Sequence, residues 1–246
     1  MEVDPGEVMD DRRPLLVLWD IDHTLIDTGG VGGRCAADAF EAVTGRRLVH
    51  PVDPTGRTEP AIFAETLRRH GIEPSEQLQG RYAAELPWQY ERRALELRTR
   101  GRVLPGARAA LAAMAVEPGV VQAVLTGNLR AVAVLKLAAY GLESFVDWEV
   151  GGYGDDAVRR PALVRVAQAR AGTKWTVHFD RTNTTVVGDS IGDVQAGRDG
   201  GAAVVAVASG RDRAGELLAA GADRVLPSLL DVETLRRVLL GFRPRR

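Results

Sequence analysis

Lysine and cysteine are scarce in this chain. Only two of its 32 basic residues are lysines, Lys136 and Lys174, and Cys35 is its one cysteine. A single cysteine excludes an intramolecular disulfide and any CxxC metal site, and a mechanism that needs a lysine has only two candidates. The net charge of −1 gives no general reason to expect a nucleic acid or an anionic lipid as partner.

The sequence also has no apolar run long enough to cross a bilayer. Its N-terminal stretch, MEVDPGEVMDDRR, is acidic and lacks the apolar centre of a signal peptide. We therefore expect a cytoplasmic protein with neither a membrane nor a nucleic acid among its partners. The 246 residues are enough for one large domain or two modest ones.

Short apolar runs that end in small or polar residues are present at 15–20, 120–128, 184–190 and 202–210. Such runs, which hardly alternate, are typical of strands buried on both faces in a parallel sheet. Helical patterns lie between them, and a last strand-like stretch at 223–228 precedes a helix at 231–240. This alternation predicts a doubly wound, Rossmann-like α/β fold.

The stretch between the first two runs is different. It contains no strand of that type and instead has three helical patterns, near 34–44, 60–70 and 74–100. The glycine cluster at 28–33 and the LPG at 104–106 flank it. We therefore expect a helical cap domain at 28–103, hinged over an α/β core made of residues 1–27 and 104–246.

Three of the four main runs end in a polar residue that could carry chemistry: Asp20, Thr126 and Asp189. The carboxyl ends of parallel strands meet at one edge of a sheet, where ligands bind. Asp22 lies two residues after Asp20, so in an extended chain both carboxylates face the same side. Such a pair can divide the roles of nucleophile or metal ligand and proton carrier; the alternative is a polar turn with a capping aspartate.

Two other segments point to the same edge. In VLTGNLR, the Thr126 hydroxyl and the N–H groups of Gly127 and Asn128 precede a helix and predict a phosphate seat, unless this is an ordinary strand-to-helix turn. In VVGDSIGD, Asp189 and Asp193 are suited to a hard cation such as Mg²⁺. The alternative there is a loop aspartate followed by a helix cap.

The ordered set DxDxT, strand-terminal threonine, basic residue and GDSxxD resembles the haloacid dehalogenase (HAD) superfamily. The insert between the first and second motifs, and LPGARAALAAM after it, resemble the phosphoglycolate-phosphatase-like branch with its small helical cap. His23 stands where the family most often has glycine.

The resemblance implies a role for each matching residue. Asp20 would be the nucleophile and Asp22 the general acid/base. Thr126, Gly127 and Asn128 would hold the phosphoryl oxygens. Mg²⁺ would be bound by the Asp20 carboxylate, the main-chain oxygen of Asp22, Asp189 and Asp193.

The family's third motif is usually a lysine. Neither lysine fits here, because Lys136 follows Thr126 within a helix and Lys174 is in a loop. The best match is Arg160, with Arg159 as the alternative, since arginine keeps the charge and can bind phosphate through two N–H groups. Within the predicted cap, Arg57 is the candidate substrate contact.

These roles predict a Mg²⁺-dependent phosphatase that acts on a small phosphorylated metabolite through an aspartyl-phosphate on Asp20. A phosphomutase of the β-phosphoglucomutase kind would use the same residues. A dehalogenase would need neither the metal nor the second acid, and the Schiff-base route of a phosphonatase needs a cap lysine, which 28–103 lacks. A receiver-like regulator phosphorylated on Asp20 is the non-enzymatic alternative.

Overall fold

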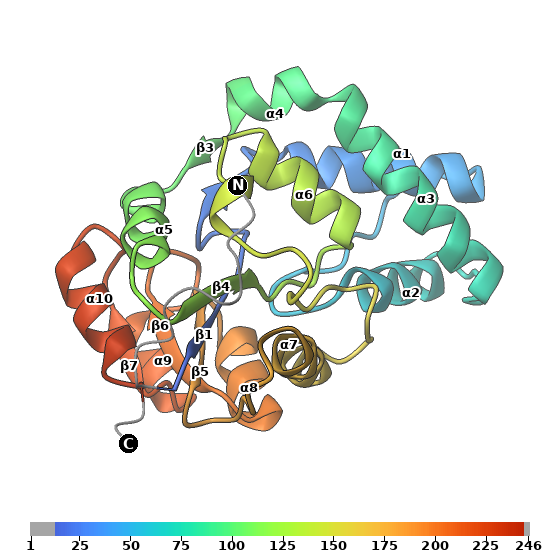
Figure 1. The fold of residues 1–246 in the computed structure, drawn as a ribbon. Helices are drawn as coiled ribbons and strands as arrows, with labels where there is room; N and C mark the ends of the chain where they lie inside the picture. The colour runs from blue at the N-terminus through green and yellow to red at the C-terminus, as the bar shows by residue number, and fades with distance from the viewer. Residues whose placement is uncertain (1–12, 244–246) are drawn as a thin grey trace.

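The computed structural model describes residues 13–243, and the prediction about the N-terminal stretch lies largely outside these residues. Five parallel strands form one sheet in the order β4-β1-β5-β6-β7, which confirms the predicted fold class (Figure 1). The strands are β1 (Leu15–Trp19), β4 (Val120–Val124), β5 (Thr184–Gly188), β6 (Ala203–Val207) and β7 (Arg224–Leu226).

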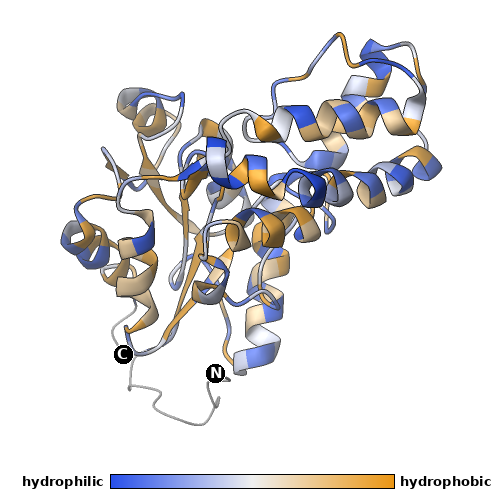
Figure 2. Ribbon diagram, turned by 90° about the horizontal axis from the view of Figure 1, so that it is seen from above, coloured by the Kyte–Doolittle hydropathy of each residue, from blue (hydrophilic) through white to orange (hydrophobic). Residues whose placement is uncertain are grey.

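Helices cover both faces of this sheet, and this explains the continuous apolar runs. Alternate residues of β1, such as Val17 and Leu18, belong to two different apolar clusters. On one face lie α5 (Ala107–Ala115) and α10 (Val232–Leu240). On the other lie α7 (Arg160–Trp175), α8 (Ile191–Gly200) and α9 (Ala214–Ala219). Figure 2 shows the strands as almost uniformly hydrophobic, whereas the helices also carry hydrophilic residues.

Between β1 and α5 the chain forms four helices, which we call the helical insert: α1 (Val31–Thr44), α2 (Glu59–Arg69), α3 (Glu76–Arg92) and α4 (Ala94–Arg100). They share an apolar cluster that contains Cys35 and extends onto α6 (Arg130–Ala138) of the α/β part through Leu129 and Val132. The predicted single helix at 74–100 is two helices, because the chain bends at Arg93 and α4 then leads back to the sheet.

A short antiparallel ribbon joins the insert to the rest of the chain. Its strands, β2 (Ile26–Asp27) and β3 (Arg102–Val103), were not expected from the sequence. Gly29, with φ of 59°, lies so close to the Arg100 carbonyl that a side chain there would overlap it. The division of the chain into core and cap at 28 and 103 stays a prediction. Among residues 13–243, no helix combines the length and the apolar character that spanning a bilayer needs.

Candidate active site

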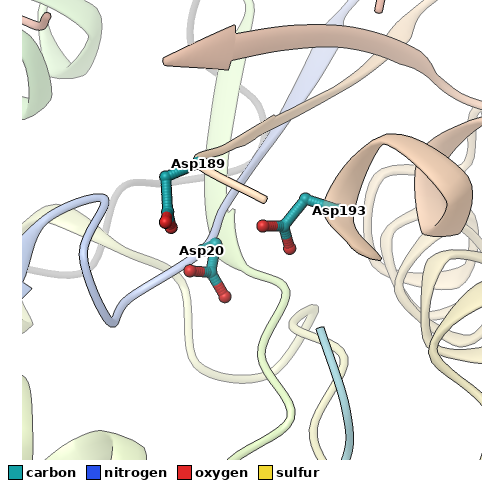
Figure 3. Close-up of side chains that lie close together, drawn as sticks. All are labelled: Asp20, Asp189 and Asp193. Atoms are coloured by element: carbon teal, nitrogen blue, oxygen red, sulfur yellow. The ribbon is translucent and has the colours of Figure 1, made fainter. Parts of the chain in front are cut away.

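Three buried carboxylates meet at the carboxyl edge of the sheet (Figure 3). Asp20 directly follows β1, Asp189 follows the neighbouring strand β5, and Asp193 is in the first turn of α8. One oxygen of each lies within 4.8 Å of one oxygen of the others. The parallel pairing of β1 and β5 therefore brings together residues that are far apart in the sequence.

The electrostatics of this group favour a bound cation. Burial, together with the charge of Asp193, raises the pKa of Asp20 well above its ordinary value, although Arg160 acts in the opposite direction. Burial and Asp193 also raise the pKa of Asp189 to about 7. Crowded carboxylates need protons or a cation to neutralise them. Carboxylate oxygens are hard ligands, so the donor set fits a divalent ion such as Mg²⁺.

Thr24, the threonine of the DxDxT segment, connects two of these carboxylates. Its hydroxyl lies 2.9 Å from Asp189 Oδ1 and 3.3 Å from Asp20 Oδ2. Thr24 is fully buried, and its single hydroxyl proton points to Asp189 at the shorter distance, so the hydroxyl mainly fixes the Asp189 side chain and lies beside that of Asp20. Thr24 is thus a site residue for which the sequence alone indicated no separate role.

The structure distinguishes the two candidate arginines. Arg160 is buried at the start of α7, and its Nη2 donates to Asp20 Oδ1 at 3.0 Å, whereas Arg159 is exposed. The same nitrogen contacts Asp193 Oδ1. Arg160 thus occupies the position expected of the third-motif base, beside Asp20.

Asp193 is held on both sides. Its Oδ2 accepts hydrogen bonds from the Ser190 amide at 3.0 Å and the Ser190 hydroxyl at 2.6 Å, and Ser190 in return caps α8. Its Oδ1 accepts from Arg160. Asp193 therefore belongs to the group of three carboxylates, but both of its oxygens have protein partners. One orients Arg160, and the other completes the reciprocal hydrogen bonds with Ser190 that cap α8.

Asp22 points to a different partner, Lys136 of α6. The Lys136 Nζ lies 2.7 and 2.8 Å from the two Asp22 oxygens, and 2.8 Å from Asn128 Oδ1. The side-chain amide nitrogen of Asn128, Nδ2, donates to Asp22 Oδ2 at 2.8 Å and to the Thr126 hydroxyl at 2.7 Å. Burial raises the pKa of Asp22, but Lys136 and Asn128 outweigh it and hold this pKa below its ordinary value.

The sequence indicated no role for Lys136, which was considered only as the third-motif base; the structure places it on Asp22 instead. Lys136 is indeed in a helix, but its side chain reaches back from the second turn of α6 to the sheet edge. One signal could have found it, because Lys136 is the only charged residue in the apolar run 131–139. A buried ammonium in such a run needs a carboxylate partner. Lys174, by contrast, is in the last turn of α7 and not in a loop as expected, and it pairs with Asp147 and Glu149 near the surface.

Gly127 is a glycine for a reason other than the one expected. We expected it to let the backbone approach a ligand, but it is the backbone of Arg57 and Thr58 that lies against it. A side chain at Gly127 would overlap the Arg57 carbonyl, and the Gly127 oxygen accepts a hydrogen bond of 2.8 Å from the Glu59 amide. The predicted phosphate seat thus lies directly under the helical insert.

The insert encloses the site. A cavity of about 510 Å³ is lined by Asp20, Asp22, Thr126 and Arg160 on the sheet side and by residues of α1, α2 and α3 on the other. Gly56 and Gly192 touch beside it, so that a Cβ on Gly56 would lie 2.8 Å from the Gly192 Cα. Arg57 lines this cavity and is partly exposed, and its guanidinium makes one long contact, 3.5 Å, with the Ala61 carbonyl.

The backbone conformation of His23 accounts for the glycine that the resembled family most often has at this position. Its φ is +64°, a left-handed conformation that costs a non-glycine residue roughly 1 kcal/mol. Its amide donates to the Ile26 carbonyl at 2.7 Å, and its carbonyl accepts from the Ser209 hydroxyl at 2.7 Å. These bonds hold the turn that presents Asp20 and Asp22.

Comparison with known proteins agrees with this architecture. The chain is similar to a hydrolase from Pseudomonas syringae (TM-score 0.67, 23% identity, covering 92% of this chain and 99% of that one). It is also similar to a predicted phosphatase from Clostridium acetobutylicum (TM-score 0.64, 16% identity, covering 93% of this chain and 99% of that one). A predicted phosphoglycolate phosphatase from Haemophilus somnus is similar as well (TM-score 0.61, 16% identity, covering 91% of this chain and 98% of that one). Among functionally curated proteins, none matches the sequence.

The family model of the haloacid dehalogenase-like hydrolases matches residues 17–198. This range begins in β1 and runs through the helical insert to α8, so it contains all the carboxylates and basic residues described above. The resemblance seen in the motifs is confirmed, and the chain belongs to the haloacid dehalogenase-like hydrolase family.

Proposed function

We propose that this protein is a Mg²⁺-dependent phosphatase that hydrolyses a small phosphorylated metabolite through an aspartyl-phosphate on Asp20. The observation that carries the proposal is the meeting of Asp20, Asp189 and Arg160 at the floor of one cavity beneath the helical insert. A carboxylate nucleophile, a hard cation site and a fixed guanidinium are together what a phosphate monoester dianion requires.

Asp20 and Asp189, with the main-chain oxygen of Asp22, would hold the metal ion. Asp193 lies in the same group and would serve mainly to hold Arg160. When bound, Mg²⁺ would supply positive charge that offsets the repulsion between the phosphate dianion and Asp20.

The residues of the chain then act in two steps. An Asp20 oxygen attacks phosphorus, and the bond from phosphorus to the ester oxygen breaks. That oxygen takes a proton from the protonated form of Asp22, which Lys136 and Asn128 keep a minor form in the free protein. Asp22 next takes a proton from a water molecule that attacks the phosphorus of the aspartyl-phosphate, which releases phosphate and restores Asp20. Arg160, Thr126 and the N–H groups of Gly127 and Asn128 would bind the phosphoryl oxygens, the Asn128 N–H exchanging its 3.2 Å contact with the Thr126 hydroxyl for a phosphoryl oxygen. The insert would act as a cap that excludes bulk water.

Hydrolysis of p-nitrophenyl phosphate by the purified protein tests this proposal. Protein treated with a chelator is expected to be inactive and to regain activity when MgCl₂ is added, with one phosphate released per nitrophenolate. Activity that persists without a divalent cation would contradict the proposal, and so would stable phosphorylation of the protein without turnover. Transfer of the phosphoryl group to a sugar hydroxyl instead of water would identify a phosphomutase.

A second test uses the crowding of the carboxylates. The pKa of Asp189 is raised to about 7 from 3.8, so between these pH values the folded, metal-free protein binds more protons than the unfolded chain. Its free energy of unfolding must therefore fall as the pH rises through this window. Because Mg²⁺ takes the place of the protons, it is expected to raise Tm more at pH 8 than at pH 5. An equal rise at both pH values would contradict the metal site.

A further inference from the structure

The cavity above Asp20 is much larger than a phosphoryl group needs, and its upper part has apolar walls. About 510 Å³ is within the range of pockets that enclose a complete small molecule. The walls that the helical insert contributes are mainly apolar side chains, among them Phe40, Leu48, Val52, Ile62 and Phe63. The same walls also carry polar side chains, among them Arg57, Glu59 and Thr66. A leaving group bound there would therefore lie against apolar surface, and these polar groups would determine which one fits.

Glu59 supplies the negatively charged polar group of this upper part. It is the first residue of α2 and lines the cavity. The Tyr82 hydroxyl donates a hydrogen bond of 2.9 Å to its Oε1, and the Tyr82 ring stacks on Phe63 with ring centroids 3.9 Å apart. The other oxygen, Oε2, accepts no hydrogen bond from any residue between 13 and 243. Oε1 of Glu59 is thus held by Tyr82, and Oε2 is free to accept a hydrogen bond from a ligand.

The position of Glu59 is coupled to the predicted phosphate seat. Its amide donates to the Gly127 carbonyl at 2.8 Å, next to Thr126. The preceding Thr58 is buried, and its hydroxyl donates to the Val158 carbonyl at 2.7 Å. A phosphate held at Thr126 and Gly127 would consequently have its ester group facing the same wall that Glu59 belongs to.

Among the described residues, no basic side chain of the cavity makes a hydrogen bond or ion pair with the free oxygen. Arg57, which also lines the cavity, contacts only the Ala61 carbonyl, at 3.5 Å. Lys136 is bonded to Asp22 and Asn128, and Arg160 to Asp20 and Asp193. Arg211, at the cavity mouth, pairs with Asp53 at 3.2 Å. Glu59 is only partly buried and its free oxygen belongs to the wall of a partly open cavity, so Oε2 is available to accept a hydrogen bond from a ligand.

We propose that Glu59 determines substrate specificity by accepting a hydrogen bond from a hydroxyl or ammonium group on the leaving alcohol. The substrate class is then a phosphate monoester whose alcohol has an apolar body and a hydrogen-bond donor at the end remote from phosphorus. This inference rests on the proposed phosphatase function and adds to it the chemistry of the part of the substrate that leaves.

Matched series of substrates test it. One series carries a terminal donor (ω-hydroxyalkyl and ω-aminoalkyl phosphates of two to six carbons), and the other ends in a methyl group (n-alkyl phosphates of equal length). The wild-type protein is expected to prefer the donor-bearing ester by about 10- to 100-fold in kcat/KM at its best chain length, as for a hydrogen bond to a charged group. Equal kcat/KM values for the two series at every length would overturn the proposal.

The variants link that preference to Glu59. Glu59→Gln presents an N–H donor or a weaker acceptor, so the ratio between the two series is expected to collapse to about one. Glu59→Asp keeps the charge but shortens the side chain by one methylene, so the best donor-bearing ester should become one carbon longer. A ratio that survives Glu59→Gln would contradict the proposal, and the ratio within one variant cancels any uniform loss of activity.

Glu65→Gln is the matched control. Glu65 is on the same helix but pairs with Arg68 and Arg69 outside the cavity, so the preference should be that of the wild type. Hydrolysis of p-nitrophenyl phosphate by the wild-type protein separates the two levels of failure. If this substrate is hydrolysed and no preference exists, only the role of Glu59 fails; if neither it nor any ester is hydrolysed, the phosphatase function fails as well.

Discussion

Replacement of Asp20 by asparagine is expected to lower kcat for p-nitrophenyl phosphate by at least about 10³-fold. The amide is a poor nucleophile and brings no negative charge to a cation, while its size and shape are nearly those of the carboxylate. Steady-state rates of the purified Asp20→Asn protein with saturating Mg²⁺ measure the loss.

The stability of this variant provides the control. The raised pKa of Asp20 shows that its charge is unfavourable in the folded, metal-free protein, and Arg160 would keep its bond to Asp193. Asp20→Asn should therefore unfold at a Tm equal to or above that of the wild type in metal-free buffer near pH 7.5. A variant that keeps more than about a tenth of the wild-type kcat would show that Asp20 is not the nucleophile.

Replacement of Lys136 by methionine is expected to have the second-largest effect. Methionine fills a similar volume but removes the cation that holds the pKa of Asp22 low. Because p-nitrophenolate leaves without a proton, turnover of this ester depends on ionised Asp22 in the second step. The acidic limb of the kcat profile should then move to higher pH by about one unit, so that kcat falls by up to about tenfold at pH values on that limb and is unchanged well above it.

The other lysine offers a matched control. Lys174 is 37% exposed at its side chain and pairs with Asp147 and Glu149, so Lys174→Met should leave the pH profile unchanged and alter stability by no more than about 1 kcal/mol. An unshifted profile in Lys136→Met would mean that Lys136 only packs, and that its bond to Asp22 has no part in proton transfer.

The sheet could be predicted from the sequence because each central strand is buried on both faces, as Val17 and Leu18 of β1 show. The meeting of Asp20 and Asp189 followed from the same topology, since parallel strands bring their carboxyl ends to one edge. The helical insert was visible as a change from short apolar runs to helical spacing. Its internal bend at Arg93 was not, because the residues on both sides are equally good helix formers.

The site was less accessible to sequence reasoning wherever a contact depends on how the insert is placed. The sequence suggested that Gly127 lets the backbone approach a ligand. Only the structure shows that the backbone of Arg57 occupies the position a Gly127 side chain would need. Lys136 had no expected role because it follows Thr126 within a helix, while its long side chain reaches from α6 to Asp22. The choice between Arg159 and Arg160 needed burial, which two adjacent arginines do not reveal.

The most direct measurement of the central claim, covalent catalysis by Asp20, is to trap the phosphorylated enzyme. Protein mixed with a ³²P-labelled phosphate ester and Mg²⁺, quenched in acid within one turnover and digested, is expected to carry label on the peptide that contains Asp20. The label should be released by mild alkali, as from an acyl phosphate, should be absent from Asp20→Asn, and should accumulate in Lys136→Met at low pH. Turnover without labelled protein, or label on a peptide that lacks Asp20, would contradict the account.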